Sequence, residues 1–294
     1  METTTKPPID VYALVTNRIL ERLEAGIIPW KQPWTEAGLP QNLITKKAYN
    51  GINLLLLASL GYTRNYFLSF KQIKELGGSV IKGEKSMPVV YWKFTEKEDP
   101  ITKEKKKQSF IRYYTVFNVN QCTGIPEAKI PEVTPIKRMQ DLEDIILEMP
   151  NPPSVRHIEN QAYYNPVADF INLPRMNAFK DVESYWGTYF HELIHATGHQ
   201  SRLNRKEIVN IANFGDEMYS NEELVAEIGA CYLKNHTGLN VNHFENSVAY
   251  IQHWLNVLKN DKRLIVFASA KAQRAVDYIL NVGPESKETI TTTS

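Results

Sequence analysis

The stretch YWGTYFHELIHATGH, residues 185–199, decides the fold predicted for the second half of this chain. His191 and His195 are four positions apart, so a helix places both imidazoles on one face, one turn apart. Two imidazoles so arranged can share a metal ion, and Glu192 adds a carboxylate that can act as a general base. The pattern predicts one Zn²⁺ per chain, or another divalent metal such as Mn²⁺. The alternative is an ordinary helix with two histidines that bind nothing.

The third ligand is not evident from this helix, although a catalytic zinc ion needs three protein ligands and a water molecule. His199 continues the stripe, but a helix carries it ~12 Å along the axis from His191. One ion cannot bridge that distance unless the helix breaks at Gly198. The metzincin pattern His-Glu-x-x-His-x-x-Gly-x-x-His is matched through Gly198, and its last histidine falls on Ser201.

A later helix offers the gluzincin solution, in which a glutamate completes the site. The segment MYSNEELVAEIGACYL, residues 218–233, carries Glu223 and Glu227 on one helical face. Two such carboxylates repel each other, unless one binds a cation and the other accepts a hydrogen bond from a ligand histidine. We predict Glu223 as the metal ligand and Glu227 as the supporting carboxylate, with the reverse assignment open. The structural alternative is a capping box in which Glu223 pairs with Ser220 at a helix start.

The segment ADFINLP, residues 168–174, reads as a short strand shortly before the histidine helix. Zincin peptidases bind peptides by pairing them with a strand edge near the metal. Residues 171–173 are the expected edge, and an ordinary core strand is the alternative. The rest of the second half is predicted as helices over 139–148, 185–197, 222–234, 244–259 and 264–280.

The two halves of the chain carry opposite charge. Residues 1–130 hold 19 Lys and Arg against 12 Asp and Glu, whereas residues 131–294 hold 15 against 21. Such asymmetry indicates that the basic first half contacts nucleic acid and that the acidic second half has a different function. Between them, residues 124–137 contain three prolines, which favour an extended linker. We therefore predict domains at 1–125 and 139–294, joined by a linker at 126–138.

The first half combines helices, a hairpin and exposed aromatic candidates. Helices are expected over 9–24, from about residue 51, and over 69–76, and the aromatic segments 86–94 and 108–119 read as paired strands. Single-stranded nucleic acid is held by aromatic stacking and by cations. The predicted DNA-binding residues combine both chemistries: Trp30, Lys31, Trp34, Lys46, Lys47, Tyr49, Asn50, Lys82, Lys85, Tyr91, Trp92 and Lys93. The alternative is that the hairpin aromatics form a small core and the lysines a solvated face.

Composition restricts the class of protein further. With 294 residues, 43% hydrophobic and 23% charged, the chain resembles an ordinary globular protein rather than a disordered or fibrous one. No apolar run approaches the ~20 residues that cross a bilayer, and the N-terminus lacks a signal-peptide core. Two cysteines, Cys122 and Cys231, cannot build a disulfide framework. We expect a cytoplasmic protein without a membrane partner.

Several blocks together resemble one family. The blocks PWKQPW, AYNGINLLLL, FLSFKQIKELGGSVIKGEKSMPVVYWKF and YYTVFNVNQCTGIP resemble the N-terminal domain of ArdC-type antirestriction proteins. The blocks FINLPRMNAF, YFHELIHATGHQSRLNR and NEELVAEIGA resemble the metallopeptidase domain of the same family. The blocks occur in the family's order and cover nearly the whole chain.

The resemblance implies an α+β protein of two domains: a small α/β domain that binds single-stranded DNA and a mainly helical, gluzincin-type metallopeptidase domain. Such proteins are carried by mobile elements and associated with protection of incoming DNA from host restriction. The expected partners are single-stranded DNA and an unidentified protein or peptide substrate. The alternative is a DNA-binding shield whose metal site is structural or inactive. The catalytic residue is expected to be Glu192, and the ligands His191, His195 and Glu223.

Overall fold

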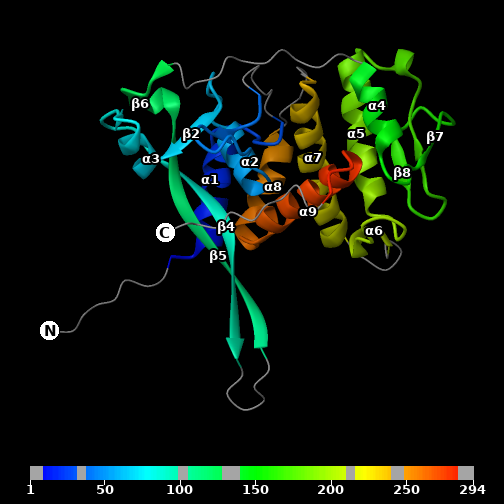
Figure 1. Cartoon of the computed structure of the whole chain (residues 1–294). Coiled ribbons are helices and arrows are strands. Elements are labelled where there is room, and N and C mark those ends of the chain that lie inside the picture. The colour runs from blue at the N-terminus through cyan, green and yellow to red at the C-terminus, as the bar shows by residue number, and fades with distance from the viewer. Residues whose placement is uncertain are drawn as a thin grey trace. The chain divides into compact units, whose positions relative to one another are not determined.

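The computed structural model describes residues 9–31, 38–98, 105–127, 140–209, 216–239 and 248–283 (Figure 1). The chain divides into two compact units that are not contiguous in sequence. The first comprises Met1–Pro29, Leu39–Val133 and Asn246–Val266, and the second comprises Trp30–Gly38, Thr134–Glu245 and Phe267–Ser294. The single predicted boundary at 126–138 therefore does not describe the whole division. Residues 30–38 belong to the second unit, and residues 246–266 belong to the first. Most of that predicted linker lies outside the described residues.

A four-stranded sheet forms the centre of the first unit. Its order is β1-β2-β5-β4, with β1 parallel to β2 and the other neighbours antiparallel. A second, two-stranded sheet joins β3 and β6. The strands are β1 Gln41–Asn42, β2 Tyr66–Ser69, β3 Ser79–Val80, β4 Met87–Glu98, β5 Lys105–Asn118 and β6 Cys122–Thr123, with a short 3-10 helix at Val119–Gln121.

The helices of the first unit begin where the sequence supplies caps. Asp10 accepts a hydrogen bond from the backbone of Ala13 at the start of α1, Val11–Glu24. Ser69 and Gln72 form a reciprocal capping box at the start of α3, Phe70–Glu75. The remaining helices are α2, Ile52–Ala58, and α8, Val248–Asn260, which contacts α1. The first unit thus includes a helix that the sequence analysis assigns to the second domain.

Strands β4 and β5 form the predicted hairpin and extend well beyond β2 as a two-stranded ribbon (Figure 1). Their pairing runs from Met87 opposite Val116 to Glu98 opposite Lys105. Opposite residues of an antiparallel pair lie on the same face, and neighbours alternate between faces. This register separates the aromatic residues of the ribbon between its two faces.

The second unit combines a small sheet with long helices. Its sheet has the order β7-β9-β8, with β7 at Ser154–Arg156, β8 at Tyr163–Asn165 and β9 at Phe170–Asn172. The helices are α4 Gln140–Glu148, α5 Val182–Thr197, α6 Lys206–Val209, α7 Asp216–Thr237 and α9 Leu264–Ile279, and a 3-10 turn lies at Met176–Ala178. The mixed α+β class, with sheets in the N-terminal part and a mostly helical C-terminal part, is confirmed. Within the described residues, none of the helices combines the length and apolar character that a membrane span needs.

The predicted peptide-binding edge is wrong. Residues 171–173 overlap β9, which pairs with β7 on one side and with β8 on the other. The backbone groups of a central strand are already used by its neighbours, so β9 offers no free edge. Strand β7 was not among the predicted strands, because it is only three residues long.

Close packing of α5 on α7 positions the helices of the second unit. A Cβ atom placed on Gly229 of α7 would lie 2.7 Å from Cδ1 of Ile194 in α5. Because that distance is below van der Waals contact, only glycine allows the two helices to approach so closely. The functional side chains described below lie on these two helices.

Candidate metal centre

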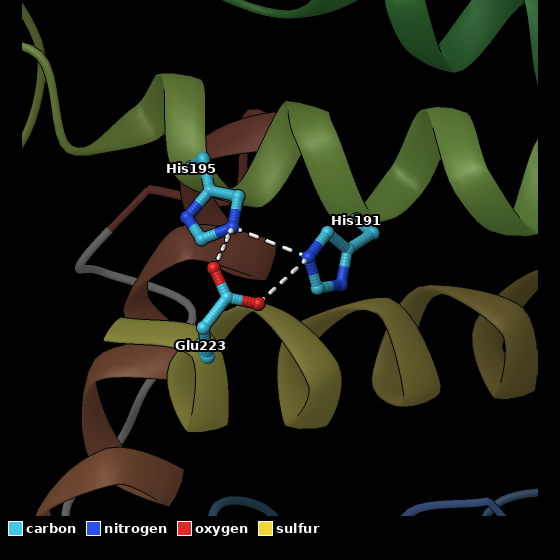
Figure 2. Close-up of side chains that lie close together, drawn as sticks. All are labelled: His191, His195 and Glu223. Atoms are coloured by element: carbon cyan, nitrogen blue, oxygen red, sulfur yellow. Dashed lines mark hydrogen bonds and ion pairs between the residues drawn. The ribbon is translucent and has the colours of Figure 1, made fainter. Parts of the chain in front are cut away.

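Helix α5 brings the two predicted histidine ligands together. Asp181 caps the helix by accepting a 2.7 Å hydrogen bond from the backbone of Ser184. One turn apart on the same face, His191 and His195 place their Nε2 atoms 3.2 Å from each other (Figure 2). The expected sharing of one helical face is therefore confirmed.

Helix α7 supplies the carboxylate that faces both imidazoles. Glu223 places Oε2 3.4 Å from Nε2 of His191 and Oε1 3.3 Å from Nε2 of His195 (Figure 2). One ligand atom from each of the three residues can be chosen so that all lie within 4.8 Å of one another. Two imidazole nitrogens and a carboxylate oxygen form a donor set suited to a divalent metal such as zinc. The residues present therefore fit the ion that the motif implies.

The capping-box alternative for Glu223 is excluded by the start of its helix. Helix α7 begins at Asp216, so Ser220 is already inside it and does not occupy an N-cap position. The carboxylate of Glu223 instead points at the two histidines (Figure 2).

The carboxylate behind the histidine is Glu222, which corrects the assignment to Glu227. Oε1 of Glu222 lies 3.3 Å from Nδ1 of His195, on the ring nitrogen that does not face Glu223. Glu227 lies one turn farther along α7, and its Oε1 is 4.0 Å from Nζ of Lys31. A carboxylate on the second ring nitrogen fixes the tautomer and orientation of a metal-binding histidine. Glu222 is placed where such a carboxylate lies, and its position next to Glu223 gave no sequence signal for it.

Arg205 holds Glu222 in place. Its Nε and Nη2 atoms donate to the two carboxylate oxygens of Glu222 at 3.0 and 2.6 Å, a bidentate pair. Nη1 donates to Oγ1 of Thr197 at 2.6 Å, and Nη2 also reaches the carbonyl of Ile194 at 2.7 Å. All of these groups are buried, so the arginine ties the end of α5 to α7 directly behind the histidine. No motif in the sequence pointed to Arg205.

The electrostatics of the centre follow from these contacts. Burial alone would lower the pKa of His195, but hydrogen bonds and attraction from Glu222 and Glu223 outweigh it and raise that pKa to about 10. For Glu223, burial acts to raise the pKa, and hydrogen bonds to His191 and His195 reverse the shift and lower it. The pKa of Glu222 is lowered despite burial, chiefly by the charge of Arg205. Both carboxylates are therefore held in the ionised form that binds cations.

A cavity of about 290 Å³ opens in front of the three candidate ligands. Glu192 lines this cavity next to His191 and is only 8% exposed. Strand β8 contributes Tyr163 and Tyr164 to the wall, and α6 contributes Glu207, which forms an ion pair with Lys271. The predicted general base, the candidate ligands and β8, an edge strand of the sheet that the described residues form, thus meet in one cavity.

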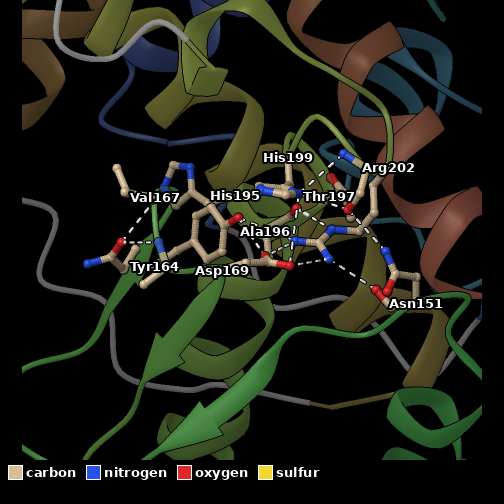
Figure 3. Close-up of polar contacts among 12 residues, drawn as sticks. Asn151, Tyr164, Val167, Asp169, His195, Ala196, Thr197, His199 and Arg202 are labelled. Atoms are coloured by element: carbon tan, nitrogen blue, oxygen red, sulfur yellow. Dashed lines mark hydrogen bonds and ion pairs between the residues drawn. The ribbon is translucent and has the colours of Figure 1, made fainter.

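His199 does not join the metal ligands. Its Nδ1 lies 2.8 Å from Oγ of Ser201, the residue that replaces the last histidine of the metzincin pattern. Arg202 has a buried side chain that forms an ion pair with Asp169 and donates to the carbonyl of Ala196 at 2.7 Å (Figure 3). Tyr164 of β8 donates to Asp169 at 2.8 Å. This network attaches the β8–β9 turn to the end of α5 and so fixes the strand edge beside the cavity.

The first predicted DNA contacts lie within residues 30–34. Trp30 is 1% exposed, so its ring has no free face on which a base could stack, and the prediction for this residue is wrong. Lys31 is close to Glu227 and, like Trp30, belongs to the second unit. Trp34 lies outside the described residues.

The other predicted DNA contacts all lie in the first unit. Lys46 and Lys47 are exposed on the turn after β1, where Lys46 lies 5.6 Å over the ring of Tyr66. Asn50 is also exposed, whereas Tyr49 is half-buried against Phe67, and burial raises the pKa of its hydroxyl. The lysines that flank the hairpin are exposed at Lys82, Lys85 and Lys93.

The ribbon presents its aromatic residues on two faces. Trp92 is 40% exposed and shares a face with Phe94, which is 69% exposed and was not among the predicted contacts. The opposite face carries Tyr91, half-buried and 6.1 Å from Tyr114, together with Lys93. Residues two positions apart in a strand lie on the same face, so the sequence could have placed Phe94 beside Trp92.

Two family models match successive parts of the chain. Residues 9–117 match the N-terminal domain of anti-restriction factor ArdC, and residues 143–271 match a zincin-like metallopeptidase. The uncharacterized protein y4eC of Sinorhizobium fredii is 31% identical over 94% of this chain and 93% of its own length. A DNA primase TraC of Escherichia coli is 33% identical over 90% of this chain, which spans only 26% of that primase.

Solved structures agree with these matches. The metal-free crystal structure of antirestriction protein ArdC from plasmid R388 is 39% identical, with a TM-score of 0.74 over 92% of this chain and 97% of that one. Its Mn(II)-bound structure is 37% identical, with the same TM-score over 93% and 98%. Fold and site thus define a zincin-like metallopeptidase domain that follows an ArdC-type N-terminal domain. The chain belongs to the ArdC family of antirestriction proteins.

Proposed function

We propose that this protein is an antirestriction factor with an active, metal-dependent peptidase site and a domain that binds single-stranded DNA. The observation that carries the proposal is the meeting of His191, His195 and Glu223 with Glu192 in one cavity. A structural metal site needs no general base and no open cavity, because such sites are closed by protein ligands. The arrangement therefore favours catalysis over the alternative, a DNA-binding shield with an inactive metal site.

Each residue has a separate role in the proposed hydrolysis. A bound divalent metal would polarise the scissile carbonyl and increase the acidity of water. His191, His195 and Glu223 would hold that ion, for which we propose Zn²⁺, whereas the R388 relative has been crystallised with Mn(II). Glu192 would take a proton from the attacking water and deliver it to the leaving amine. Glu222 and Arg205 would keep His195 oriented.

The proposed substrate is a protein segment in extended conformation. Strand β8 is an edge of its sheet, and its residues Tyr163 and Tyr164 line the cavity that contains Glu192. A peptide could add to this edge by main-chain hydrogen bonds, which leave its side chains to provide specificity. Strand β8 therefore replaces residues 171–173 as the proposed peptide-binding edge.

The N-terminal domain is proposed to bind single-stranded DNA along the hairpin ribbon. Within 87–98 and 105–118, six Lys and Arg residues stand against two Glu residues. Exposed Trp92 and Phe94 can stack on bases, while Lys93 and Arg112 on the other face can contact phosphates. Matches to the ArdC N-terminal domain support this assignment. A reducing cytoplasm is the proposed compartment, in agreement with the finding that Cys122 and Cys231 are not joined in a disulfide.

The decisive experiment compares Glu192→Gln with the wild type. DNA carrying the gene is introduced into a restricting host, and the surviving fraction is measured together with the metal content of purified protein. We expect Glu192→Gln to keep its metal and lose protection, because the base lies beside the ion and does not bind it. Glu227→Gln is the matched control, since this glutamate lies outside the cavity. Full protection by metal-loaded Glu192→Gln would favour the shield.

A further inference from the structure

A second cavity lies entirely in the first unit and shares no residue with the metal centre. Its volume is about 440 Å³, and it is bordered by α1, by the end of α2, by residues 83–86, which connect β3 to β4, and by the start of β4. Three cationic side chains line it: Arg18, Arg22 and Lys85. Two carboxylates, Glu21 and Glu84, also line it. Apolar and aromatic side chains form another part of the wall: Leu56, Leu60, Tyr62 and Met87.

The charges around the cavity do not balance. Arg18 pairs with Glu21 at 2.9 Å, and Glu84 accepts a 2.8 Å hydrogen bond from Gln121. Arg22 and Lys85 have no carboxylate partner among the described residues. The hydrogen bond from Gln121 leaves the charge of Glu84 in place, so three cations face two carboxylates and the lining has a surplus of one positive charge. A concave wall would concentrate the field of that surplus on an anionic ligand.

Arg22 is partly immobilised and partly unsatisfied. Its Nη2 donates to the carbonyl of Ser59, which ties the guanidinium to the end of α2. Its Nε is buried and finds no hydrogen-bond partner in the described part of the chain. A buried donor without an acceptor is unfavourable, so the placement of the guanidinium beside the cavity carries a free-energy cost. The planar arrangement of arginine donors matches the oxygens of a phosphate group.

We propose that this cavity binds the phosphate group of a nucleotide, with the base against the apolar wall beside Tyr62. Free phosphate would leave the side formed by Leu56, Leu60 and Met87 without contacts, whereas a nucleotide combines an anion with a flat ring. The volume lies in the range of small-molecule sites. The nucleotide is either a free 5′-monophosphate or one unit within a single strand, and both sources present the same phosphate chemistry.

The test uses the full-length protein and two probes. Thymidine 5′-monophosphate is titrated by calorimetry, with thymidine as the phosphate-free control, and a fluorescein-labelled dT12 with a 5′-hydroxyl is followed by anisotropy. The variants are Arg22→Gln and Lys85→Gln, and Lys85 is exposed, so its replacement leaves the fold intact. Lys71→Gln is the matched control, because Lys71 is an exposed lysine of the same unit outside the cavity.

We expect both cavity variants to weaken binding about tenfold or more, while Lys71→Gln matches the wild type. Weaker binding of the monophosphate identifies a free nucleotide as the source, and weaker binding of dT12 alone identifies a unit of the strand. Normal binding of both probes by both variants, or no binding of either probe by the wild type, overturns the proposal. Wild-type protein that binds the monophosphate but not dT12 would refute single-stranded DNA binding and leave the cavity assignment standing.

Discussion

Nδ1 of His195 lies 3.3 Å from Oε1 of Glu222, while Nε2 of the same ring lies 3.3 Å from Oε1 of the adjacent residue, Glu223. Two consecutive glutamates of α7 thus contact the two nitrogens of one imidazole, one each. One nitrogen is directed to the metal position and the other to a buried carboxylate. Glu222 and Glu223 are identical neighbours in the sequence, yet each contacts a different nitrogen of His195.

Replacement of the candidate ligands should remove the metal. His191→Ala or Glu223→Ala leaves two protein donors, too few for a stable site. We expect plasma emission spectrometry to find about one metal ion per chain in the wild type and far less in both variants. Glu192→Gln serves as the control and should retain its metal. A fully metallated Glu223→Ala protein would show that another residue is the third ligand.

Glu222 and Glu227 should differ in their effect on metal affinity. Glu222→Gln weakens the contact that orients His195, and loss of such a partner typically lowers affinity ~10–100-fold. Glu227→Gln should bind metal as the wild type does, because Glu227 is directed to Lys31. Competition with a chromophoric chelator measures both constants. Equal affinities for the two variants would contradict the role given to Glu222.

Metal binding should release a proton. Without a metal ion, His195 has a pKa raised to about 10, so it is protonated at neutral pH. A ligand imidazole must be neutral, so the ion displaces that proton, and affinity rises with pH up to about this pKa. Calorimetry in buffers of different ionisation enthalpy should give about one proton per ion. A buffer-independent enthalpy near pH 7 would refute this.

Gly229→Ala should destabilise the second unit. Its new methyl group would lie 2.7 Å from Cδ1 of Ile194 and force α5 and α7 apart. Overpacking of this kind typically costs ~1–3 kcal/mol of unfolding free energy. Ile194→Ala removes the opposing atoms, so the double variant should be more stable than the two single losses predict. Chemical denaturation of the wild type, the two single variants and the double variant measures their free energies of unfolding. If the two single losses simply add in the double variant, Gly229 and Ile194 do not compete for space.

Tryptophans 30 and 92 should behave differently. Trp92→Ala or Phe94→Ala should weaken binding of single-stranded DNA by ~1–3 kcal/mol for each lost stacking contact. Trp30→Ala should instead cost ~3–5 kcal/mol of stability, because it empties a buried site. Fluorescence anisotropy and thermal melting separate these effects. Normal DNA affinity in a folded Trp92→Ala, Phe94→Ala double variant would exclude the ribbon face as a stacking surface.

The sequence by itself determined the features that depend on local periodicity. The spacing of His191 and His195 specifies a shared helical face wherever the helix lies in the fold, because 3.6 residues complete one turn. The aromatic and β-branched residues of 86–94 and 108–119 likewise predict two paired strands, because such side chains favour extended backbone. The start of α3 at Ser69 could also be predicted from the sequence, because the capping residues Ser69 and Gln72 are only three positions apart in the chain.

Only the tertiary structure decided which distant groups meet. The packing of α7 on α5, which brings Gly229 against Ile194, places Glu222 and Glu223 at the histidines and leaves Glu227 near Lys31. Burial of Trp30 and the central position of β9 depend on contacts with segments far away in sequence. Periodicity describes one element at a time, whereas a third ligand, a sheet edge and a buried ring are properties of packed pairs.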